Sequence, residues 1–239
     1  MLPFKIKYDC QTTTMSVVNI TKVAQFKGHQ DAIYAMDIDS SCGVIYSAGA
    51  DGKLVKWNWP SDSDGIQIAQ LPGTAYSLKI VENGKIYLGT STGELLIVES
   101  NAGEIVKRVE LHQGGLFDVV IHGDKMYTLG ADGVLTVGNK DGSDFSKYKI
   151  SEKSLRKGLV RENELWVACS DHMLRRIDLD SMKVIQENEG HRSSIFDILG
   201  VEGKIYSAGR DASIKMWSLE NEVKQLKSVP AHMYTIHSL

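Results

Sequence analysis

One sequence segment occurs in this chain in two similar copies. Residues 47–57 read SAGADGKLVKW and residues 207–217 read SAGRDASIKMW, and a Gly-His pair precedes each copy, at Gly28-His29 and Gly190-His191. Each copy consists of a strand-like run closed by small residues, a turn through an Asp, and a second strand-like run that ends on a Trp. Repetition of a whole supersecondary unit restricts the chain to repeat architectures.

The repeat has a period of about 40 residues and runs through the whole chain. We call the position that holds His in the two best copies the anchor of the repeat. The anchors are His29, Leu71, His112, Ser151, His191 and His232. After each anchor an apolar segment predicts an inner strand, and these segments are residues 33–38, 75–81, 116–121, 155–160, 195–201 and 236–239. Three further strand-like segments follow each of the first five. A period of this length with four short strands per repeat is typical of a β-propeller.

The sixth repeat is divided between the two ends of the sequence. Residues 236–239 supply only its inner strand, and three further strand-like segments lie at residues 3–8, 14–20 and 22–26. A blade shared by both ends closes the ring without leaving a free sheet edge. We therefore predict an all-β fold, a single closed β-propeller of six four-stranded blades that forms one domain over residues 1–239. A seven-bladed, incomplete ring is the alternative.

The order Gly-His, inner strand, Ser-Ala-Gly-x-Asp and strand ending in Trp resembles the WD-repeat family. In that family the His, Ser, Asp and Trp of one blade form a buried hydrogen-bonded set. The resemblance gives this structural role to His29, Ser47, Asp51, Trp57, His191, Ser207, Asp211 and Trp217. The chemistry agrees, because an indole N–H only donates, a carboxylate only accepts, and Ser and His can relay between them.

The middle repeats depart from this pattern. The third repeat has Thr128 in place of Ser and Gly138 in place of Trp, and the repeats around Thr92 and Asp171 have lost both His and Trp. The strand pattern stays intact in all three. We therefore expect blades here, with the middle of the chain the least secure part of the assignment.

Composition excludes several classes of protein. The net charge is −3, from 27 basic and 30 acidic side chains, so no global field attracts nucleic acid or an anionic membrane. The first residues contain no apolar signal region, and no apolar run is long enough to span a membrane. Cys10, Cys42 and Cys169 lack metal-ligand or CxxC spacing, which favours a cytoplasmic, or alternatively nuclear, location.

Catalytic motifs carry little weight here. Residues 89–93 match G-x-S-x-G around Ser91, but a nucleophile elbow needs a strand-to-helix turn, and this pentapeptide is predicted to be a hairpin turn. No metal-ligand set or phosphate loop is present, so we expect no cofactor and no metal. The basic stretch from Lys147 to Arg161 is interpreted as a solvated outer strand and loop, with a docking patch for an acidic partner as the alternative.

The resemblance also points to a binding surface. In the WD-repeat family, the residue five after the anchor and the residue before the turn Asp line the face around the central channel. These positions are Tyr34, Tyr76, Phe117, Arg156, Phe196, Arg210 and His237. Aromatic and Arg side chains of this kind often dominate interfaces. The alternative interpretation is that the aromatic side chains pack on one another and plug the channel.

We therefore predict a non-enzymatic scaffold, a monomeric propeller within a larger complex, that binds a protein partner through a peptide or loop on this face. A reader of a modified residue or small ligand is the second hypothesis, because an aromatic ring can hold a methylated ammonium by cation–π contact. A propeller hydrolase using Ser91 is the third.

Overall fold

The part of the chain that the computed structural model describes comprises residues 21–22, 25–59, 64–218 and 223–239. It is built almost entirely of β-structure. The described residues form twenty strands and one short 3-10 turn, η1 (Glu82–Gly84). The strands make five separate four-stranded antiparallel sheets, and each sheet uses four strands that are consecutive in the sequence.

We call these sheets blades 1 to 5. Blade 1 contains β1 (Ile33–Asp39), β2 (Val44–Gly49), β3 (Lys53–Asn58) and β4 (Ile66–Gln70). Blade 2 contains β5 (Ala75–Val81), β6 (Lys85–Thr90), β7 (Glu94–Glu99) and β8 (Ile105–Glu110). Blade 3 contains β9 (Leu116–His122), β10 (Lys125–Gly130), β11 (Val134–Asn139) and β12 (Ser143–Lys149). Blade 4 contains β13 (Leu155–Arg161), β14 (Glu164–Cys169), β15 (Met173–Asp178) and β16 (Val184–Glu189). Blade 5 contains β17 (Ile195–Val201), β18 (Lys204–Gly209), β19 (Ser213–Ser218) and β20 (Lys224–Pro230).

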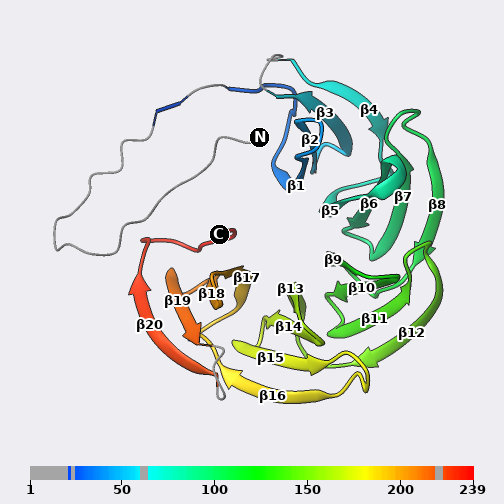
Figure 1. Cartoon of the computed structure of the whole chain (residues 1–239). Coiled ribbons are helices and arrows are strands. Elements are labelled where there is room, and N and C mark those ends of the chain that lie inside the picture. The colour runs from blue at the N-terminus through cyan, green and yellow to red at the C-terminus, as the bar shows by residue number, and fades with distance from the viewer. Residues whose placement is uncertain (1–20, 23–24, 60–63, 219–222) are drawn as a thin grey trace.

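The blades are arranged around a common centre, as in a propeller (Figure 1). The first strand of each blade is innermost and the fourth is outermost. Inner strands of consecutive blades contact each other, β1 with β5, β5 with β9, β9 with β13, and β13 with β17. The five repeats predicted to be complete are therefore confirmed as blades, including the two that lack His and Trp.

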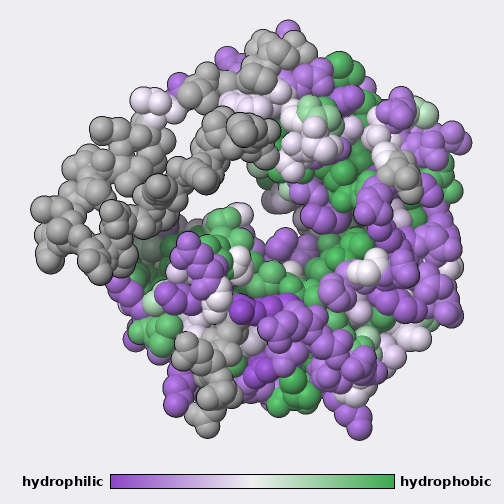
Figure 2. Space-filling model, viewed as in Figure 1, coloured by the Kyte–Doolittle hydropathy of each residue, from purple (hydrophilic) through white to green (hydrophobic). Residues whose placement is uncertain are grey.

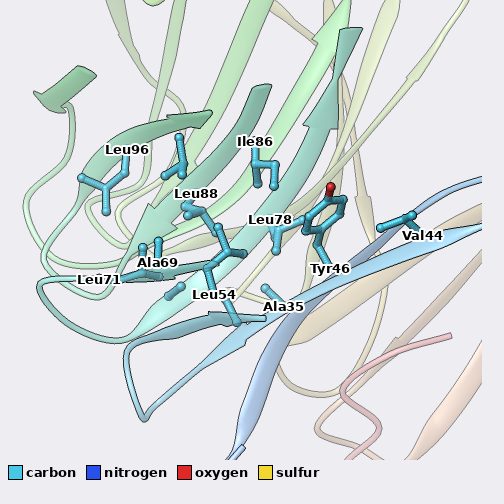
Figure 3. Close-up of a cluster of buried hydrophobic side chains, with 13 residues drawn as sticks. Ala35, Val44, Tyr46, Leu54, Ala69, Leu71, Leu78, Ile86, Leu88 and Leu96 are labelled. Atoms are coloured by element: carbon cyan, nitrogen blue, oxygen red, sulfur yellow. The ribbon is translucent and has the colours of Figure 1, made fainter. Parts of the chain in front are cut away.

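Apolar side chains between neighbouring blades form the core. Tyr46 and Leu54 of blade 1 pack in one cluster with Leu78 and Leu88 of blade 2 (Figure 3). In blade 2, which lies between blades 1 and 3, the middle strand β6 is buried on both faces, whereas the outer strand β8 alternates between half-buried and exposed side chains. The inner edges of the blades are thereby held around the centre, which is hollowed in the view of Figure 2.

The face of blade 1 that does not contact blade 2 is open in the described structure. Met36 is 69% exposed, whereas Val119 and Ile198, at the same place in their repeats, are each 3% exposed. Ile33 and Ile38 on the same strand are also more than half exposed. Leu199 and Val201 of β17 in blade 5 are exposed as well. Exposed apolar side chains therefore lie on both blade 1 and blade 5, the first and last of the described blades.

The predicted sixth inner strand is only partly borne out. Residues 236–239 form no strand, and the strand predicted to pair with them lies at residues 3–8, outside the described residues. The segment is nevertheless held beside β17. The backbone N–H of Leu239 donates to Asp197 Oδ2 at 2.7 Å, and the N–H of Gly158 donates to Asp118 Oδ2 at 2.9 Å in the same way.

Because Asp197 and Asp118 occupy equivalent positions, Leu239 lies where the next inner strand of the ring would run. Of the segments predicted to complete the sixth blade, residues 3–8 and 14–20 lie outside the described residues, and only residues 22, 25 and 26 of the last segment are described.

Candidate functional site

The two best-preserved repeats form the predicted polar sets. In blade 1, His29 Nδ1 lies 3.0 Å from Asp51, His29 Nε2 lies 2.7 Å from Ser47 Oγ, and Trp57 Nε1 donates to the same hydroxyl at 2.8 Å. Blade 5 repeats these contacts at 2.9, 2.7 and 2.9 Å through His191, Asp211, Ser207 and Trp217. In each of these two blades, the four residues link the β-strands of that blade to one another.

The electrostatics explain how such a set is tolerated inside a blade. Burial lowers the pKa of His191, although Asp211 opposes the shift, so the imidazole is neutral near pH 7. Burial works against ionisation of Asp211 as well, but the backbone N–H of Arg192 and the His191 ring outweigh it and lower the pKa of this carboxyl. A neutral His can donate from Nδ1 to Asp and accept at Nε2 from Ser, which satisfies every member.

Blade 3 keeps part of the set. His112 Nδ1 lies 3.0 Å from Asp132 and His112 Nε2 lies 2.8 Å from Thr128 Oγ1, so Thr replaces Ser. The missing indole is replaced by packing, because the ring of Phe145 lies directly over Gly138 and would collide with any Cβ there. The loss of Trp at this position therefore has a local structural reason.

Blades 2 and 4 use ionic groups instead. In blade 4, Ser151 Oγ donates to Asp171 at 2.7 Å, and Arg175 pairs with Asp171 at 2.8 Å. In blade 2, Glu94 accepts a hydrogen bond from Thr92 at 3.0 Å and pairs with Arg108 at 2.5 Å. The contacts of blade 2 join β7 to β8, and those of blade 4 join the turn at Asp171 to β15 and to Ser151 before β13.

Six of the seven predicted binding residues form one continuous chain of contacts at the centre of the molecule; Arg210 is the seventh. The ring centroids of Tyr34 and Tyr76 lie 5.4 Å apart, and those of Tyr76 and Phe117 lie 5.5 Å apart. The guanidinium of Arg156 lies 4.1 Å from the Phe117 centroid and 5.2 Å from that of Phe196. The stack ends with Phe196 and His237, 5.0 Å apart. We call this set, Tyr34, Tyr76, Phe117, Arg156, Phe196 and His237, the central rim.

A repeated backbone irregularity positions the central rim. In every inner strand the pairing register shifts at the rim residue, so that Tyr34, Tyr76, Phe117, Arg156 and Phe196 are each the extra, unpaired residue of a β-bulge. A bulge bends the strand and re-aims the side chain of the extra residue. The five bulges thus turn five consecutive blades into one array of side chains. Nothing in the residue pattern alone marks them.

Charged groups lie immediately below the central rim. Lys157, the residue after Arg156, pairs with Asp118 at 3.2 Å, and the coulombic attraction of Asp118 is the main reason that its pKa is raised. Lys79 of blade 2 pairs in the same way with Asp37 of blade 1 at 3.1 Å. These carboxylates also accept backbone N–H groups from the following blade, so they join neighbouring blades.

The basic stretch from Lys147 to Arg161 does not form the single outer surface that we expected. Lys147 and Lys149 belong to the outer strand β12, whereas Arg156 and Lys157 belong to the inner strand β13. The chain crosses from the outside of blade 3 to the centre within this stretch, so its charges face different surroundings.

The remaining predicted residues fall where the repeat places them. Arg210 is exposed in the turn between β18 and β19, and its backbone N–H donates to Ser194 O, two residues before Phe196. Ser91 lies in the turn between β6 and β7, and within the described residues no histidine contacts its hydroxyl.

Two further findings concern metals and membranes. The described residues contain no cluster of His, Cys, Asp or Glu suited to a metal ion. Among them there is also no helix with the length and apolar character needed to cross a bilayer.

Comparison with known proteins agrees with this architecture. Residues 20–58 match the family model described as WD domain, G-beta repeat. The chain superposes on the computationally designed Ika8 protein with a TM-score of 0.72 at 17% identity, covering 90% of this chain and 67% of that one. It superposes on the WD40 β-propeller domain of Doa1 with a TM-score of 0.64 at 18% identity, covering 90% and 88%. At these identities the likeness shows the fold.

Two curated proteins are similar in sequence. A probable serine/threonine-protein kinase pats1 from Dictyostelium discoideum is 36% identical over 73 residues, or 30% of this chain. The intraflagellar transport protein 80 homolog from Rattus norvegicus is 26% identical over 192 residues, or 72% of this chain. The matches span only 2% and 24% of the lengths of these relatives.

Radial four-stranded blades, two of them tied by a complete His-Ser-Asp-Trp set, define a β-propeller of the repeat type. Residues 20–58 match the WD-repeat model, and the described chain has the fold of solved WD40 propellers.

Proposed function

We propose that this chain is a non-enzymatic interaction scaffold that binds a peptide or loop of a protein partner on the central rim. The observation that supports this best is the continuous contact chain from Tyr34 to His237, aimed by one bulge per blade. Five bulges at equivalent places cost ladder hydrogen bonds, and they gain an array of aromatic side chains at the surface of the channel. Tyr, Phe and Arg provide large contact area at modest ordering cost.

The rim side chains do pack on one another, as the plug interpretation expects, but they are not sealed. Tyr34 is 55% exposed, and the other members are half-buried or exposed. A stacked array that remains accessible is pre-organised for binding, because its members lose little further freedom when a partner arrives. Packing and binding are therefore compatible at this site.

The alternative of a methyl-lysine reader is less favoured by the charges. The space between the Phe117 and Phe196 rings already holds the guanidinium of Arg156. A second cation placed there would meet like-charge repulsion. A hydrolase is less favoured too, since Ser91 lacks a neighbouring base within the described residues, and the match to a kinase-named relative covers only 2% of that protein.

We also propose that residues 1–239 form one domain closed by a sixth blade, with a cytoplasmic or nuclear location as a monomeric propeller within a larger complex. The placement of Leu239 beside Asp197 supports the sixth blade, and so does the open apolar face of β1. An incomplete seven-bladed ring is the alternative to the closed six-bladed ring.

Affinity capture tests the binding face. A triple variant, Tyr34→Ala, Phe196→Ala and Arg210→Ala, should lose partners that the unmodified chain retains, while melting within a few degrees of it. The matched control replaces three exposed apolar residues of the outer strands, Val106, Ile185 and Leu226, by Ala. If both triple variants retain the same partners as the unmodified chain, the central rim is not the binding face.

A further inference from the structure

Arg156 is the one permanent cation of the central rim. It projects from the bulge of β13, and the rings of Phe117 and Phe196 lie on its two sides, at 4.1 and 5.2 Å from the guanidinium carbon. Its Nε donates to Ser170 Oγ at 2.8 Å. The side chain is therefore fixed in position by three neighbours before any ligand arrives.

This guanidinium lacks a counterion in the described part of the chain. Arg108, Arg175 and Arg176 each pair with a carboxylate, and so does the adjacent Lys157. Arg156 makes no such pair. Burial without a counterion lowers its pKa, which shows that its surroundings disfavour an uncompensated charge. A supplied anion would remove that penalty.

The geometry of the stack limits how an anion can approach. The rings of Phe117 and Phe196 flank the guanidinium, and Ser170 takes the Nε donor. The side chain is half-buried, and within the described residues no hydrogen bond or ion pair engages its terminal nitrogens. That leaves the edge of the fork, where two parallel N–H groups match the two oxygens of a carboxylate.

The surroundings of Arg156 add positive charge on the same side of the molecule. Lys153, Arg192 and Arg210 are exposed in the loops of blades 4 and 5. Of the acidic residues in these loops, Asp171 pairs with Arg175 and Glu152 with Lys149, whereas Asp211 keeps its negative charge beside the neutral ring of His191. The three exposed cations outnumber this charge. Around blades 4 and 5 the rim is therefore basic, whereas around blades 1 and 2 it is aromatic, through Tyr34 and Tyr76.

We propose that the central rim selects an acidic peptide, and that the Asp or Glu side chain of this peptide binds the exposed edge of Arg156. This inference rests on the proposed function and specifies the chemistry of the partner. The carboxylate meets the guanidinium between Phe117 and Phe196, and a neighbouring apolar side chain of the peptide packs on Tyr34 and Tyr76. The binding motif therefore carries an acid beside an apolar residue.

An array of synthetic peptides tests the proposal on the intact chain. Each seven-residue peptide carries a central Asp or Glu beside Leu or Phe, and its paired control carries Asn or Gln instead. A third set carries phosphoserine at the centre. We expect the acidic peptides to be retained about tenfold more strongly than their amide controls, as a single charge-assisted bidentate contact provides.

Substitutions of Arg156 test whether this residue causes the preference for acidic peptides. Arg156→Met keeps an unbranched apolar stem in the stack but removes the fork, and should reduce the acid-to-amide ratio to near one. Arg156→Lys keeps the charge without the bidentate geometry, and should leave an intermediate ratio. The matched control is Arg192→Met, an exposed Arg of the same sector outside the central rim, which should lower the ratio much less than Arg156→Met does. Melting curves verify that each variant is folded.

The possible outcomes separate the two proposals. If peptide binding depends on Tyr34 and Tyr76 but acidic and amide peptides bind equally well, the central rim binds peptides, and the proposed preference for acidic peptides is wrong. If Arg192→Met lowers the ratio as much as Arg156→Met, the preference comes from general charge and the assignment to Arg156 is wrong. If phosphoserine peptides bind more strongly than peptides with Asp or Glu, the group that binds Arg156 is a phosphate, and the assignment to a carboxylate is wrong. If no peptide set binds above the level of the Tyr34→Ala, Phe196→Ala double variant, both proposals fail.

Discussion

Burial keeps the imidazoles of His112 and His191 in their neutral form, since it lowers the pKa of both despite the carboxylate beside each ring. A neutral ring can donate to Asp and accept from a hydroxyl at the same time, whereas a protonated ring can only donate. The hydrogen-bonded sets of blades 3 and 5 therefore depend on pH through one residue each, His112 and His191.

Stability should fall as the pH is lowered from 7.5 to 5. The unfolded chain takes up protons at His near its ordinary pKa of about 6.5, but the folded chain resists protonation of His112 and His191. The unfolded state then binds more protons, so the free energy of unfolding decreases as the pH falls. Asp132 and Asp211, whose pKa values are lowered, stay ionised in this window. Denaturant titration at several pH values measures the slope.

Single variants identify the residues responsible. His112→Gln and His191→Gln should each be less stable at pH 7.5 and should each show a shallower decline toward pH 5. His122→Gln, which changes an exposed histidine at the end of β9, is the control and should keep the full decline. Burial raises the pKa of Asp197, which acts in the opposite direction but equally in all variants. Equal slopes in every variant would contradict the assignment.

At the scale of the strand, the sequence predicted the elements but not their irregularities. Apolar alternation, small residues and polar turns located twenty strands, because strand formation in a blade depends on burial of side chains and not on the identity of the polar set. Blade 2 shows this, since it has Leu71 at the anchor and a Thr92–Glu94–Arg108 network, whereas blades 1 and 5 have His and Trp.

The bulges could not be predicted in this way. A one-residue shift of pairing register depends on the strand opposite, and Tyr34 or Arg156 would fit a regular strand equally well. On the resemblance alone, the repeat position five after the anchor selected residues that contact one another in the structure. It did not indicate that Arg156 would lie between two rings, or that Lys157 beside it would point to a carboxylate.

The neighbouring inner strands are joined by Asp118. Its Oδ2 accepts the backbone N–H of Gly158, and its Oδ1 pairs with Lys157, both from the next blade. Replacement by Ala should lower the free energy of unfolding by about 1–3 kcal/mol, because it leaves a buried N–H without an acceptor. Asp118→Asn should cost less, since an amide oxygen can still accept from Gly158. Denaturant titration compares the two.

Asp124→Ala provides the control for this pair. Asp124 is an exposed acidic residue in the turn between β9 and β10, so its loss removes the same charge without removing a contact between blades. If Asp124→Ala destabilises the chain as much as Asp118→Ala, the effect arises from net charge, and the contact between blades is not responsible.

At the scale of the whole molecule, the main question is what covers the open side of blade 1. Repeat counting predicted a sixth blade shared by both ends of the sequence, and the described residues contain five complete blades with residues 236–239 placed beside β17. Closure depends on segments at residues 3–8 and 14–20, so it cannot follow from the contacts of the described residues. It follows as a prediction from the exposed apolar faces of β1 and β17.

Removal of residues 1–21 should therefore destabilise the molecule. Ile33, Met36 and Ile38 of β1 are more than half exposed, Leu199 and Val201 of β17 are 43% and 42% exposed, and a sixth blade would bury all five. At about 1 kcal/mol for each side chain that becomes buried, the loss should be on the order of 5 kcal/mol. Denaturant titration measures it, and hydrogen exchange should become faster in β1 before it does so in β9.

Adding the removed segment back distinguishes closure from a general effect of shortening. A synthetic peptide of residues 1–21 should bind the shortened chain, raise its melting temperature and restore slow exchange in β1, because the open face then regains its covering strands. A peptide of the same composition in scrambled order is the control and should do neither. If the shortened chain is as stable as the full chain, the N-terminal segment does not complete a blade, and the six-bladed closure is wrong. A seven-bladed ring predicts a different result, since one segment cannot supply both missing blades and β1 would stay in fast exchange.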